Sequence, residues 1–483
     1  MIDPCAESSR CLLCASAPCT AACPKGMDPG RGIRAVRFDD IRCAGLYLNA
    51  AACTDCDAPC EKACIHYDLP VRVRLIAQAV PSGKAAEPHA DLSVDFCGFR
   101  CESPFLLASS AVCNNYEMTA RAFDMGWAGV VYKTASLMHI EEVSPRFDRI
   151  EKGGTSFLGF RNMEQVSANP AEVDFESISR LKRNYPTKLV IASIMGRDTD
   201  EWAGLARMAE EAGADMVECN FSCPQMKGKG LGSDVGQNND LVRLYTSAVK
   251  KALRIPVIVK MTPNITHIEE PAEAAKEAGA DAIAAINTIK SITPNHRSEV
   301  SGKHTVSGYS GRAVKPIAQR MILDIATAGG TKGMPLSGIG GIETWRDALE
   351  FIRLGCATVQ VCTAVMEYGY RIIDDLTLGL RDYMQNRGIG RLEELVGSGL
   401  KDFVTPEELD RATYILPKFN RETCVGCGRC AISCADGGHQ AIAFDPAVRK
   451  PSLIGKNCVG CHLCMLVCPT GSITPTNRIP KKG

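Results

Sequence analysis

Residues 189–221 read LVIASIMGRDTDEWAGLARMAEEAGADMVECNF. Short apolar runs rich in β-branched residues begin and end this stretch, and a helical period lies between them. Residues 271–281, PAEAAKEAGAD, repeat the end of the helix before another apolar run. We therefore expect Gly213 and Gly279 to end these two helices. Strand–helix–strand repeats of this kind predict a parallel sheet covered by helices.

Eight strand-like runs lie between residues 100 and 365. They are residues 105–111, 129–134, 189–195, 215–221, 256–261, 282–288, 335–341 and 358–364. Eight parallel strands alternating with helices predict an α/β fold, the (β/α)₈ TIM barrel, with its active site at the carboxyl ends of the strands. An open doubly wound sheet is the alternative. It is disfavoured because no G-x-G-x-x-G motif opens a helix after the first strand.

The 25 cysteines divide the chain into three parts. Ten lie within residues 5–64, eight lie within residues 424–468, and only seven lie between. We therefore predict an N-terminal domain at residues 1–85, the barrel at 90–390 and a C-terminal domain at 415–483. The joints are expected within residues 79–93, which lack an apolar period, and around 389–420.

Composition excludes several functional classes. The chain of 483 residues has 55 basic and 55 acidic side chains, so its formal charge of zero argues against a basic nucleic-acid surface or a polybasic membrane tail. No apolar run approaches the ~20 residues of a membrane helix, and the N-terminus lacks the pattern of a secretion signal. We expect a cytoplasmic protein whose reduced thiols bind metal.

The C-terminal cysteines form two regular runs. Residues 424–434 read CVGCGRCAISC, and residues 458–469 read CVGCHLCMLVCP. Each is the C-x₂-C-x₂-C-x₃-C run of a two-cluster ferredoxin, in which the fourth cysteine ligates the other cluster. Structural zinc, the alternative, prefers separated C-x₂-C pairs. We predict one [4Fe–4S] cluster on Cys424, Cys427, Cys430 and Cys468, and a second on Cys434, Cys458, Cys461 and Cys464.

The N-terminal cysteines are less regular. Residues 11–24 read CLLCASAPCTAACP and residues 53–64 read CTDCDAPCEKAC. These eight cysteines supply ligands for two further clusters, although zinc or an empty domain remains an alternative. Cys5 and Cys43 fall outside both groups and are interpreted as non-ligands.

Polar residues gather where the predicted barrel has its mouth. They follow or end four of the strands, at Lys133 and Thr134, at Asn220, Ser222 and Cys223, at Lys260, and at Asn287 and Thr288. Each residue could also have a purely structural role: a lysine can form a structural ion pair, and a cysteine can simply be buried in the core. Their shared position at one end of the barrel favours a functional site.

The seventh and eighth strands end in a pattern suited to phosphate. SGIGGIET, residues 337–344, is followed by VCTA at residues 361–364, and barrels build phosphate sites from these two loops. Glycines let backbone N–H groups approach a phosphate, and a following helix N-terminus adds its positive end. FMN fits this site, because a flavin converts single electrons from iron–sulfur clusters into hydride. We expect Ser109, Gly340, Gly341, Cys362 and Thr363 to contact it.

Longer motifs carry a family resemblance that covers nearly the whole chain. They are YKTAS (132–136), GFRNMEQ (159–165), ECNFSCPQM (218–226), KMTPN (260–264), AINTIKSI (285–292) and SGIGGIETW (337–345). Together with both cysteine-rich ends, these motifs resemble the FMN and iron–sulfur portions of the dihydropyrimidine dehydrogenase family. The resemblance implies an FMN-binding TIM barrel flanked by a helical N-terminal iron–sulfur domain and a C-terminal two-cluster ferredoxin-like domain.

The resemblance also implies roles for individual residues. Cys223 matches the family's general acid. The family's pyrimidine contacts correspond to Asn162, Asn220, Asn287 and Thr288, with Ser222 at the same edge. The lysines beside the flavin correspond to Lys133 and Lys260. The N-terminal ligand sets would be Cys11, Cys14, Cys19 and Cys64, and Cys23, Cys53, Cys56 and Cys60. One departure is that Ala77 stands near the place of a glutamine ligand in the family, so an all-cysteine cluster is expected.

The implied activity is reduction of a pyrimidine such as uracil or thymine, with electrons from a partner. This chain shows no FAD or NAD motif, so the partner is an NAD(P)H-oxidising flavoprotein subunit or a ferredoxin. Two alternatives remain open: a relative of dihydroorotate dehydrogenase, and a non-catalytic iron–sulfur subunit for electron transfer.

Overall fold

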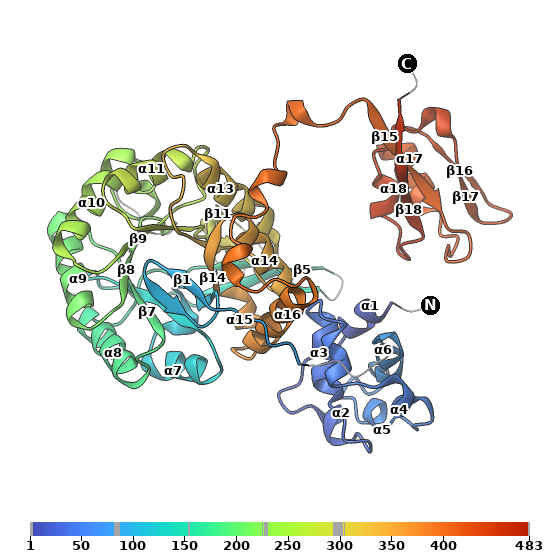
Figure 1. Cartoon of the computed structure of the whole chain (residues 1–483), viewed down its shortest axis with the longest axis horizontal. Coiled ribbons are helices and arrows are strands. Elements are labelled where there is room, and N and C mark those ends of the chain that lie inside the picture. Colours follow the sequence, from blue (N-terminus) through green and yellow to red (C-terminus); the bar gives the residue numbers. More distant parts are fainter. Residues whose placement is uncertain are drawn as a thin grey trace. The chain divides into compact units, whose positions relative to one another are not determined.

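The computed structural model describes residues 3–81, 87–152, 155–224, 226, 230–292, 303 and 305–481. The chain forms two compact units, Ser8–Asp402 (the barrel unit) and Met1–Glu7 with Phe403–Gly483 (the C-terminal unit). The three-domain division at 1–85, 90–390 and 415–483 stays a prediction, and residues 82–86 of its first joint lie outside the described residues. Figure 1 shows the elements of each unit.

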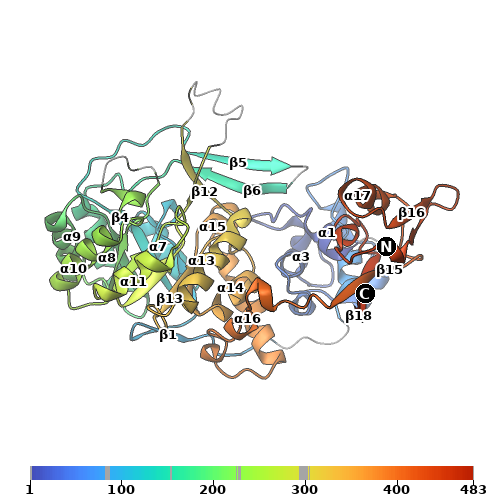
Figure 2. The same ribbon diagram turned by 90° about the horizontal axis from the view of Figure 1, so that it is seen from above.

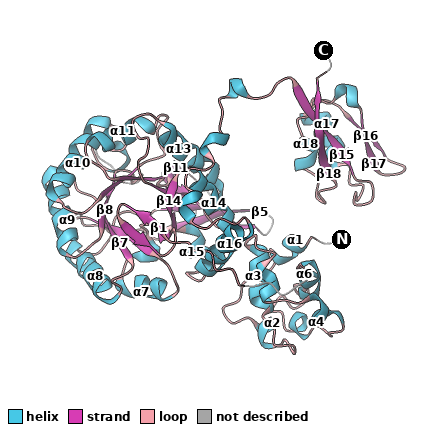
Figure 3. Ribbon diagram, in the orientation of Figure 1, coloured by secondary structure: helices cyan, strands magenta, loops and turns pink. Residues whose placement is uncertain are grey.

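Eight parallel strands close into a barrel, as Figure 3 shows. The strands are β3 (Phe105–Leu107), β4 (Gly129–Ala135), β7 (Leu189–Ile194), β8 (Met216–Asn220), β9 (Val257–Lys260), β10 (Ala282–Ala285), β13 (Leu336–Ile339) and β14 (Cys356–Val361). Their order around the barrel follows the chain, β3-β4-β7-β8-β9-β10-β13-β14. All eight predicted strands are confirmed, and the open doubly wound sheet is excluded.

Helices surround the barrel. They are α7 (Tyr116–Asp124), α8 (Ala171–Asn184), α9 (Thr199–Glu211), α10 (Asn239–Ala252), α11 (Glu269–Glu277), α13 (Lys315–Thr327), α14 (Trp345–Arg353), α15 (Thr363–Tyr368) and α16 (Ile372–Asn386). Gly213 and Gly279 follow the C-cap residues of α9 and α11 with φ of +83° and +97°, which glycine adopts without strain. The expected glycine stops therefore lie one residue past each cap.

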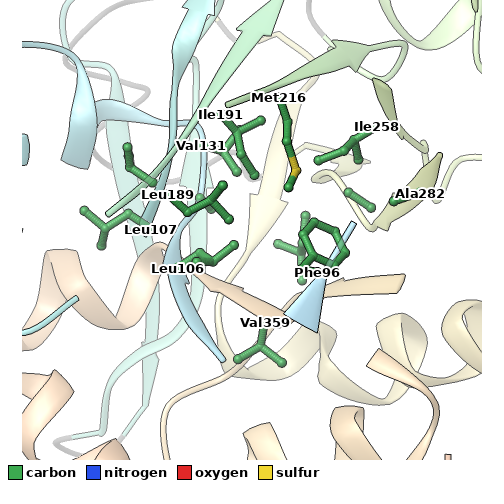
Figure 4. Packing of buried hydrophobic residues seen from close by; sticks show 14 of the residues in the cluster. Phe96, Leu106, Leu107, Val131, Leu189, Ile191, Met216, Ile258, Ala282 and Val359 are labelled. Carbon is green, nitrogen blue, oxygen red and sulfur yellow. The ribbon is translucent and has the colours of Figure 1, made fainter. Parts of the chain in front are cut away.

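A hairpin that the sequence did not predict closes the amino end of the barrel. It consists of β1 (Val94–Phe96) and β2 (Phe99–Cys101). Phe96 is fully buried, and Figure 4 shows its ring among side chains of the barrel strands, including Leu106, Ile258 and Val359. Because apolar side chains fill this end, the opposite end of the barrel is left for polar groups.

A four-stranded antiparallel sheet stands beside the barrel mouth. Its order is β11-β12-β6-β5, with β5 at Phe147–Lys152, β6 at Thr155–Asn162, β11 at Ile289–Ser291 and β12 at Ser307–Ser310. Figure 2 shows β5, β6 and β12 projecting from the barrel. In the register, Gly308 pairs with Asn162, so loops after β4 and β10 jointly build this sheet.

The N-terminal part of the barrel unit is helical, as expected. Its helices are α2 (Pro18–Ala21), α3 (Pro29–Arg37), α4 (Ala50–Thr54), α5 (Pro59–Lys62) and α6 (Val73–Ala79), whereas most of α1 (Pro4–Ser8) is counted with the C-terminal unit. They share a core of their own, which includes Ile33, Val36 and Ile76. A half-buried ion pair between Arg34 of α3 and Asp375 of α16 joins this core to the barrel.

The C-terminal unit holds two short sheets and two helices. Strand β15 (Thr413–Phe419) pairs with β18 (Ile473–Pro480), and β16 (Ile442–Asp445) pairs with β17 (Lys450–Leu453). The helices are α17 (Arg429–Gly437) and α18 (Leu463–Leu466). Among the helices described, none combines the length and apolar character needed to cross a membrane.

Candidate active site

A cavity with about 1160 Å³ of empty space opens at the carboxyl ends of the barrel strands. Its wall combines strand ends with side chains from β6 and β12 of the adjoining sheet. Thirteen of the fourteen residues expected to act on substrate or flavin line it: Ser109, Lys133, Thr134, Asn162, Asn220, Cys223, Lys260, Asn287, Thr288, Gly340, Gly341, Cys362 and Thr363. The structure therefore brings together residues that lie up to 254 positions apart in sequence.

A network of hydroxyls and amides fixes the inner wall of this cavity. The Asn220 amide Nδ2 donates to Thr134 Oγ1 at 3.0 Å, and the Thr134 hydroxyl also lies 3.1 Å from Ser109 Oγ and 2.9 Å from Ser193 Oγ. These groups are buried or half-buried, so their hydrogen bonds hold the side chains in defined orientations. The side-chain amide of Asn220 is consequently held in a fixed orientation at the cavity wall.

Ser222, the fourteenth residue, is fully buried and does not line the cavity. Its hydroxyl donates to Asn220 Oδ1 at 2.9 Å and accepts from Asn287 Nδ2 at 2.8 Å. Asn287 Oδ1 in turn accepts the backbone N–H of Thr288 at 2.8 Å. Ser222 therefore aligns the two asparagines with each other from behind the wall.

Each cationic side chain among the described residues of the cavity wall faces a carboxylate. Lys133 pairs with Glu164, which also binds Arg146 at 3.0 Å. Lys260 Nζ lies 3.6 Å from Glu218 Oε1. The third cation is Arg312, whose guanidinium lies 3.1 Å from both Glu343 and Glu367.

Cys223 is 4% exposed and follows β8 at the cavity wall. The backbone N–H of Ser233 donates to Cys223 O at 3.0 Å, which folds the loop after β8 back onto the cysteine. Gly232, at φ +54°, makes this approach possible, because a Cβ there would lie 2.3 Å from Cys223 O. The glycine and the cysteine are thus coupled through the backbone.

The end of the cavity after β13 and β14 is narrow and glycine-lined. Gly340 and Gly341 have φ of +130° and +74°, and a Cβ at either would lie 2.7 Å from a neighbouring side chain. Thr363 Oγ1 lies 3.2 Å from Ser310 Oγ. Burial raises the pKa of the nearby Cys362 thiol, which keeps it protonated.

The helices after β13 and β14 begin differently: α15 starts at Thr363 in the cavity wall without a side-chain cap, whereas α14 begins with a capping box. The start of α14 is capped by its own residues: Asp347 accepts the backbone N–H groups of Glu343 and Thr344 at 3.0 and 2.8 Å, and Thr344 accepts that of Asp347. A capping box of this kind satisfies the N–H groups that would otherwise meet an anion. After β13, the backbone at Gly340 and Gly341 is left as the approach to a phosphate.

The C-terminal cysteines surround two small cavities. One is lined by Cys424, Cys427, Cys430 and Cys468, and the other by Cys434, Cys458, Cys461 and Cys464. These are the two ligand sets that the crossed ferredoxin pattern predicts. Burial, together with neighbouring thiols, raises the pKa of the Cys464 thiol to about 11, so a bound metal is needed to hold the thiolate form.

The N-terminal cysteines also fall into two groups. Burial raises the pKa of the Cys19 thiol to about 11, with Cys11 as its strongest thiol neighbour, and burial raises the pKa of the Cys60 thiol to about 11 beside Cys23 and Cys53. Adding the neighbours of Cys11 and Cys53 gives the sets Cys11, Cys14, Cys19, Cys64 and Cys23, Cys53, Cys56, Cys60. This grouping agrees with the sets implied by the resemblance, which stay predictions.

Comparison with known proteins identifies the family. Residues 91–384 match the model for dihydroorotate dehydrogenase, and residues 418–474 match that for a 4Fe-4S dicluster domain. The chain belongs to the dihydroorotate dehydrogenase family. This family binds flavin, and the second match shows that the chain carries a 4Fe-4S dicluster domain. The predicted oxidoreductase class is confirmed.

Two named relatives show which proteins this dihydroorotate dehydrogenase family member is similar to. It is 52% identical to the Escherichia coli K12 protein named NAD-dependent dihydropyrimidine dehydrogenase subunit PreA, over 75% of this chain and 89% of that protein. It is 39% identical to the chloroplastic dihydropyrimidine dehydrogenase (NADP(+)) of Arabidopsis thaliana, over 67% of this chain and 80% of that one. The resemblance predicted from the motifs is confirmed.

A solved structure shares the fold of this dihydroorotate dehydrogenase family member. The DHODH of Eimeria tenella in complex with ferulenol superimposes with a TM-score of 0.56 at 22% identity, covering 64% of this chain and 89% of that chain.

Sequence reasoning missed the carboxylates and several other residues of the wall. They are Glu164, Tyr309, Arg312, Glu343, Gln360 and Glu367 in the wall, and Glu218 behind it. Glu218 stands two residues before Asn220 on the same strand, so strand alternation alone places both side chains on the inner face. Its partner Lys260 lies on the neighbouring strand, in register with Asn220. Only the fold brings Arg312, Glu343 and Glu367 together.

Proposed function

We propose that this chain is the catalytic subunit of a dihydropyrimidine dehydrogenase, which interconverts uracil or thymine with the 5,6-dihydropyrimidine. Two relatives, at 52% and 39% identity, carry that activity in their names. The catalytic apparatus would be Cys223 as general acid with Asn162, Asn220, Asn287 and Thr288 at the pyrimidine edge.

The proposed substrate rests mainly on one observation: every cation among the described residues of the cavity wall is paired with a carboxylate. Because Lys133, Lys260 and Arg312 each face carboxylates, none is left uncommitted for a carboxylate on the substrate. The remaining polar wall consists of amides and hydroxyls, and an amide offers both a donor and an acceptor. This set suits the alternating C=O and N–H groups of a neutral pyrimidine.

A dihydroorotate dehydrogenase-like activity is the second candidate, favoured by the family model that matches residues 91–384. Orotate differs from uracil by a carboxylate, and burying that charge without a cation is costly. The paired cations therefore favour uracil. A non-catalytic electron-transfer subunit is the third candidate, and the defined orientation of Asn220 and Asn287 argues against it.

The cavity fits FMN. Gln360 lines the cavity, and its Oε1 is buried without a hydrogen-bond partner among the described residues. Gly340 and Gly341 line the cavity with positive φ, so their backbone would be open to a phosphate, and Lys133 and Lys260 in the same wall would lie beside the flavin. Bound FMN supplies two-electron chemistry, delivered as hydride to carbon 6 of the pyrimidine.

Residues of the chain would orient the pyrimidine and supply the proton. The amides of Asn220 and Asn287, held by Ser222, orient the pyrimidine edge, and Asn162 approaches from the adjoining sheet. Hydride arrival leaves negative charge at carbon 5, which the Cys223 thiol neutralises by donating its proton. A thiol has a pKa of about 8.5 in water, so it is protonated and able to donate at neutral pH.

Electrons would reach the barrel through four [4Fe–4S] clusters, two on the N-terminal and two on the C-terminal cysteine sets. Their source would be an NAD(P)H-oxidising flavoprotein subunit or a ferredoxin, since one-electron carriers need such a donor. The name of the E. coli relative, which calls it a subunit, supports a partner for this chain.

Anaerobic turnover tests the proposal. The protein is reconstituted with iron, sulfide and FMN, supplied with chemically reduced viologen, and assayed for uracil loss and dihydrouracil formation in wild type and Cys223→Ala. Turnover that collapses in the variant supports the substrate class and the proton donor. An absence of turnover in a wild-type protein with full cluster and FMN content contradicts the pyrimidine assignment.

A further inference from the structure

Glu218 is an acidic side chain enclosed in the interior of the barrel. Its side chain is 0% exposed, and Oε1 lies 3.6 Å from Lys260 Nζ, whose own side chain is 4% exposed. Glu218 Oε2 accepts from Gln360 Nε2 at 3.2 Å. Lys260 and Gln360 line the cavity, whereas Glu218 stands behind them. The carboxylate therefore meets the cavity only through these two residues.

The charge of Glu218 needs compensation from a cation. Removing a carboxylate from water is costly unless a positive group lies close by. Oε1 accepts no hydrogen bond from any described residue, so its nearby compensation is the ammonium of Lys260. The dependence is mutual, because Lys260 is also excluded from water and Glu218 is its ionic partner among the described residues.

A column of neutral groups holds the carboxylate in place. Gln360 Nε2 donates to Glu218 Oε2 and to Ser337 Oγ, both at 3.2 Å, and Thr358 Oγ1 donates to Ser337 Oγ at 2.9 Å. These groups come from β13 and β14, across the barrel from β8. Three strands thus fix the position of Glu218, and Glu218 transmits that position to Lys260 on β9.

The second lysine of the cavity is arranged differently. Lys133 pairs with Glu164, but the same carboxylate also binds Arg146 at 3.0 Å. Arg146 also pairs with Glu142 at 3.0 Å, so Lys133 belongs to a group of two cations and two carboxylates. Glu164 is thus shared between two cations, whereas Glu218 pairs with Lys260 alone among the described residues.

We infer that Glu218 is a positioning residue that holds the Lys260 ammonium at the flavin face of the cavity and offsets its charge, so that it lowers the reduction potential of the flavin. This inference rests on the proposed FMN chemistry. A reduced flavin is anionic beside a cation, and a nearby carboxylate weakens that stabilisation. Lowering the potential strengthens hydride donation to the pyrimidine.

A double-mutant cycle tests the inference in the full chain. The midpoint potential of bound FMN is measured by spectroelectrochemical titration in wild type, Glu218→Gln, Lys260→Met and the double variant. The expected result is a positive shift in Glu218→Gln that disappears in the Lys260→Met background. Glu218→Asp, which keeps the charge, is expected to stay near the wild-type potential.

Glu164→Gln is the matched control, because it removes the carboxylate partner of the other lysine. Its shift should persist in the Lys260→Met background. A Glu218→Gln potential equal to wild type, or a shift of the same size with and without Lys260, overturns the inference. Since the titration contains no pyrimidine, these outcomes are separate from the substrate assignment; a wild-type chain that takes up no FMN would instead overturn the proposed function.

Discussion

The barrel unit and the C-terminal unit bury very different interiors. The barrel core is a large cluster of aliphatic and aromatic side chains, many of them fully buried, such as Leu106, Trp202 and Phe351. The described buried hydrophobic residues of the C-terminal unit are Cys430, Cys434, Ala441, Cys464 and Ile473, and three of these five are expected cluster ligands. The burial of so few residues does not offset the conformational entropy that about 80 residues lose on folding.

This difference assigns different roles to cofactors in the two units. In the barrel, packing holds the fold, and FMN would occupy a site already formed by hydrogen-bonded side chains. In the C-terminal unit, metal binding would supply most of the folding free energy, as it does in small metal-dependent domains. The following predictions test that contrast, from the largest expected effect to the smallest.

Iron removal should unfold one unit and spare the other. After chelation, hydrogen–deuterium exchange is expected to lose its protection throughout residues 413–480, because few apolar contacts remain there. All three tryptophans, Trp127, Trp202 and Trp345, lie in the barrel unit, so their fluorescence reports that unit alone. It should stay native. Retained protection of residues 413–480 in the iron-free chain would contradict the contrast.

Cys223→Ala should lower pyrimidine turnover by about 10²–10⁴-fold, the usual contribution of a general acid. Iron content and FMN content are expected to match wild type. Cys219→Ala is the matched control, because Cys219 is buried on β8, the strand that Cys223 follows, but lies outside the cavity wall. Comparable losses in both variants would show that the effect is structural.

Leu106→Ala should destabilise the barrel unit by about 2–5 kcal/mol, since the side chain is fully buried and its loss leaves a cavity. Leu466→Ala, in the C-terminal unit, removes a side chain that is 83% exposed and should change stability by less than about 0.5 kcal/mol. Denaturant unfolding, followed by tryptophan fluorescence for the first variant and by cluster absorbance for the second, provides the comparison.

The free energy of unfolding of the barrel unit should also depend on pH because of Asp174. Burial raises the pKa of this carboxyl to about 6, against hydrogen bonds from Asn169 and Ser167 that oppose the shift. A raised pKa means that the folded state binds the proton more tightly, so this contribution is present at pH 4 and is lost as the pH rises through 6. Asp174→Asn cannot titrate.

The measurement for Asp174 is the unfolding free energy of wild type and Asp174→Asn in the iron-free chain from pH 4 to 7. The variant is expected to gain on the order of 3 kcal/mol relative to wild type over that range, from about two pKa units. A difference between the two proteins that does not vary with pH would refute the raised pKa.

Sequence alone predicted the barrel because strands buried on both faces form continuous apolar runs between amphipathic helices. It missed the sheet of β5, β6, β11 and β12, because short polar strands such as Ser307–Ser310 carry little hydrophobic pattern and pair with Phe160–Asn162 far away in the chain. Regular cysteine spacing predicted the C-terminal ligand sets, which the two cysteine-lined cavities match.

The same limit applies to the site. Lys133, Asn220 and Lys260 were recognisable because they end strands, and strand ends converge in a barrel. Their partners Glu164 and Glu218 were not, since ion pairing depends on distances that sequence does not contain. The charge balance of the cavity, on which the proposed preference for uracil over orotate depends, therefore comes from the fold.

Substrate discrimination tests the central claim most directly. Fully reduced enzyme, prepared anaerobically with clusters and FMN, is mixed with uracil or with orotate, and the dihydro product is measured per chain in a single turnover. The account predicts dihydrouracil from uracil and little or no dihydroorotate from orotate, because the cations of the wall are already paired. Faster reduction of orotate than of uracil would contradict it.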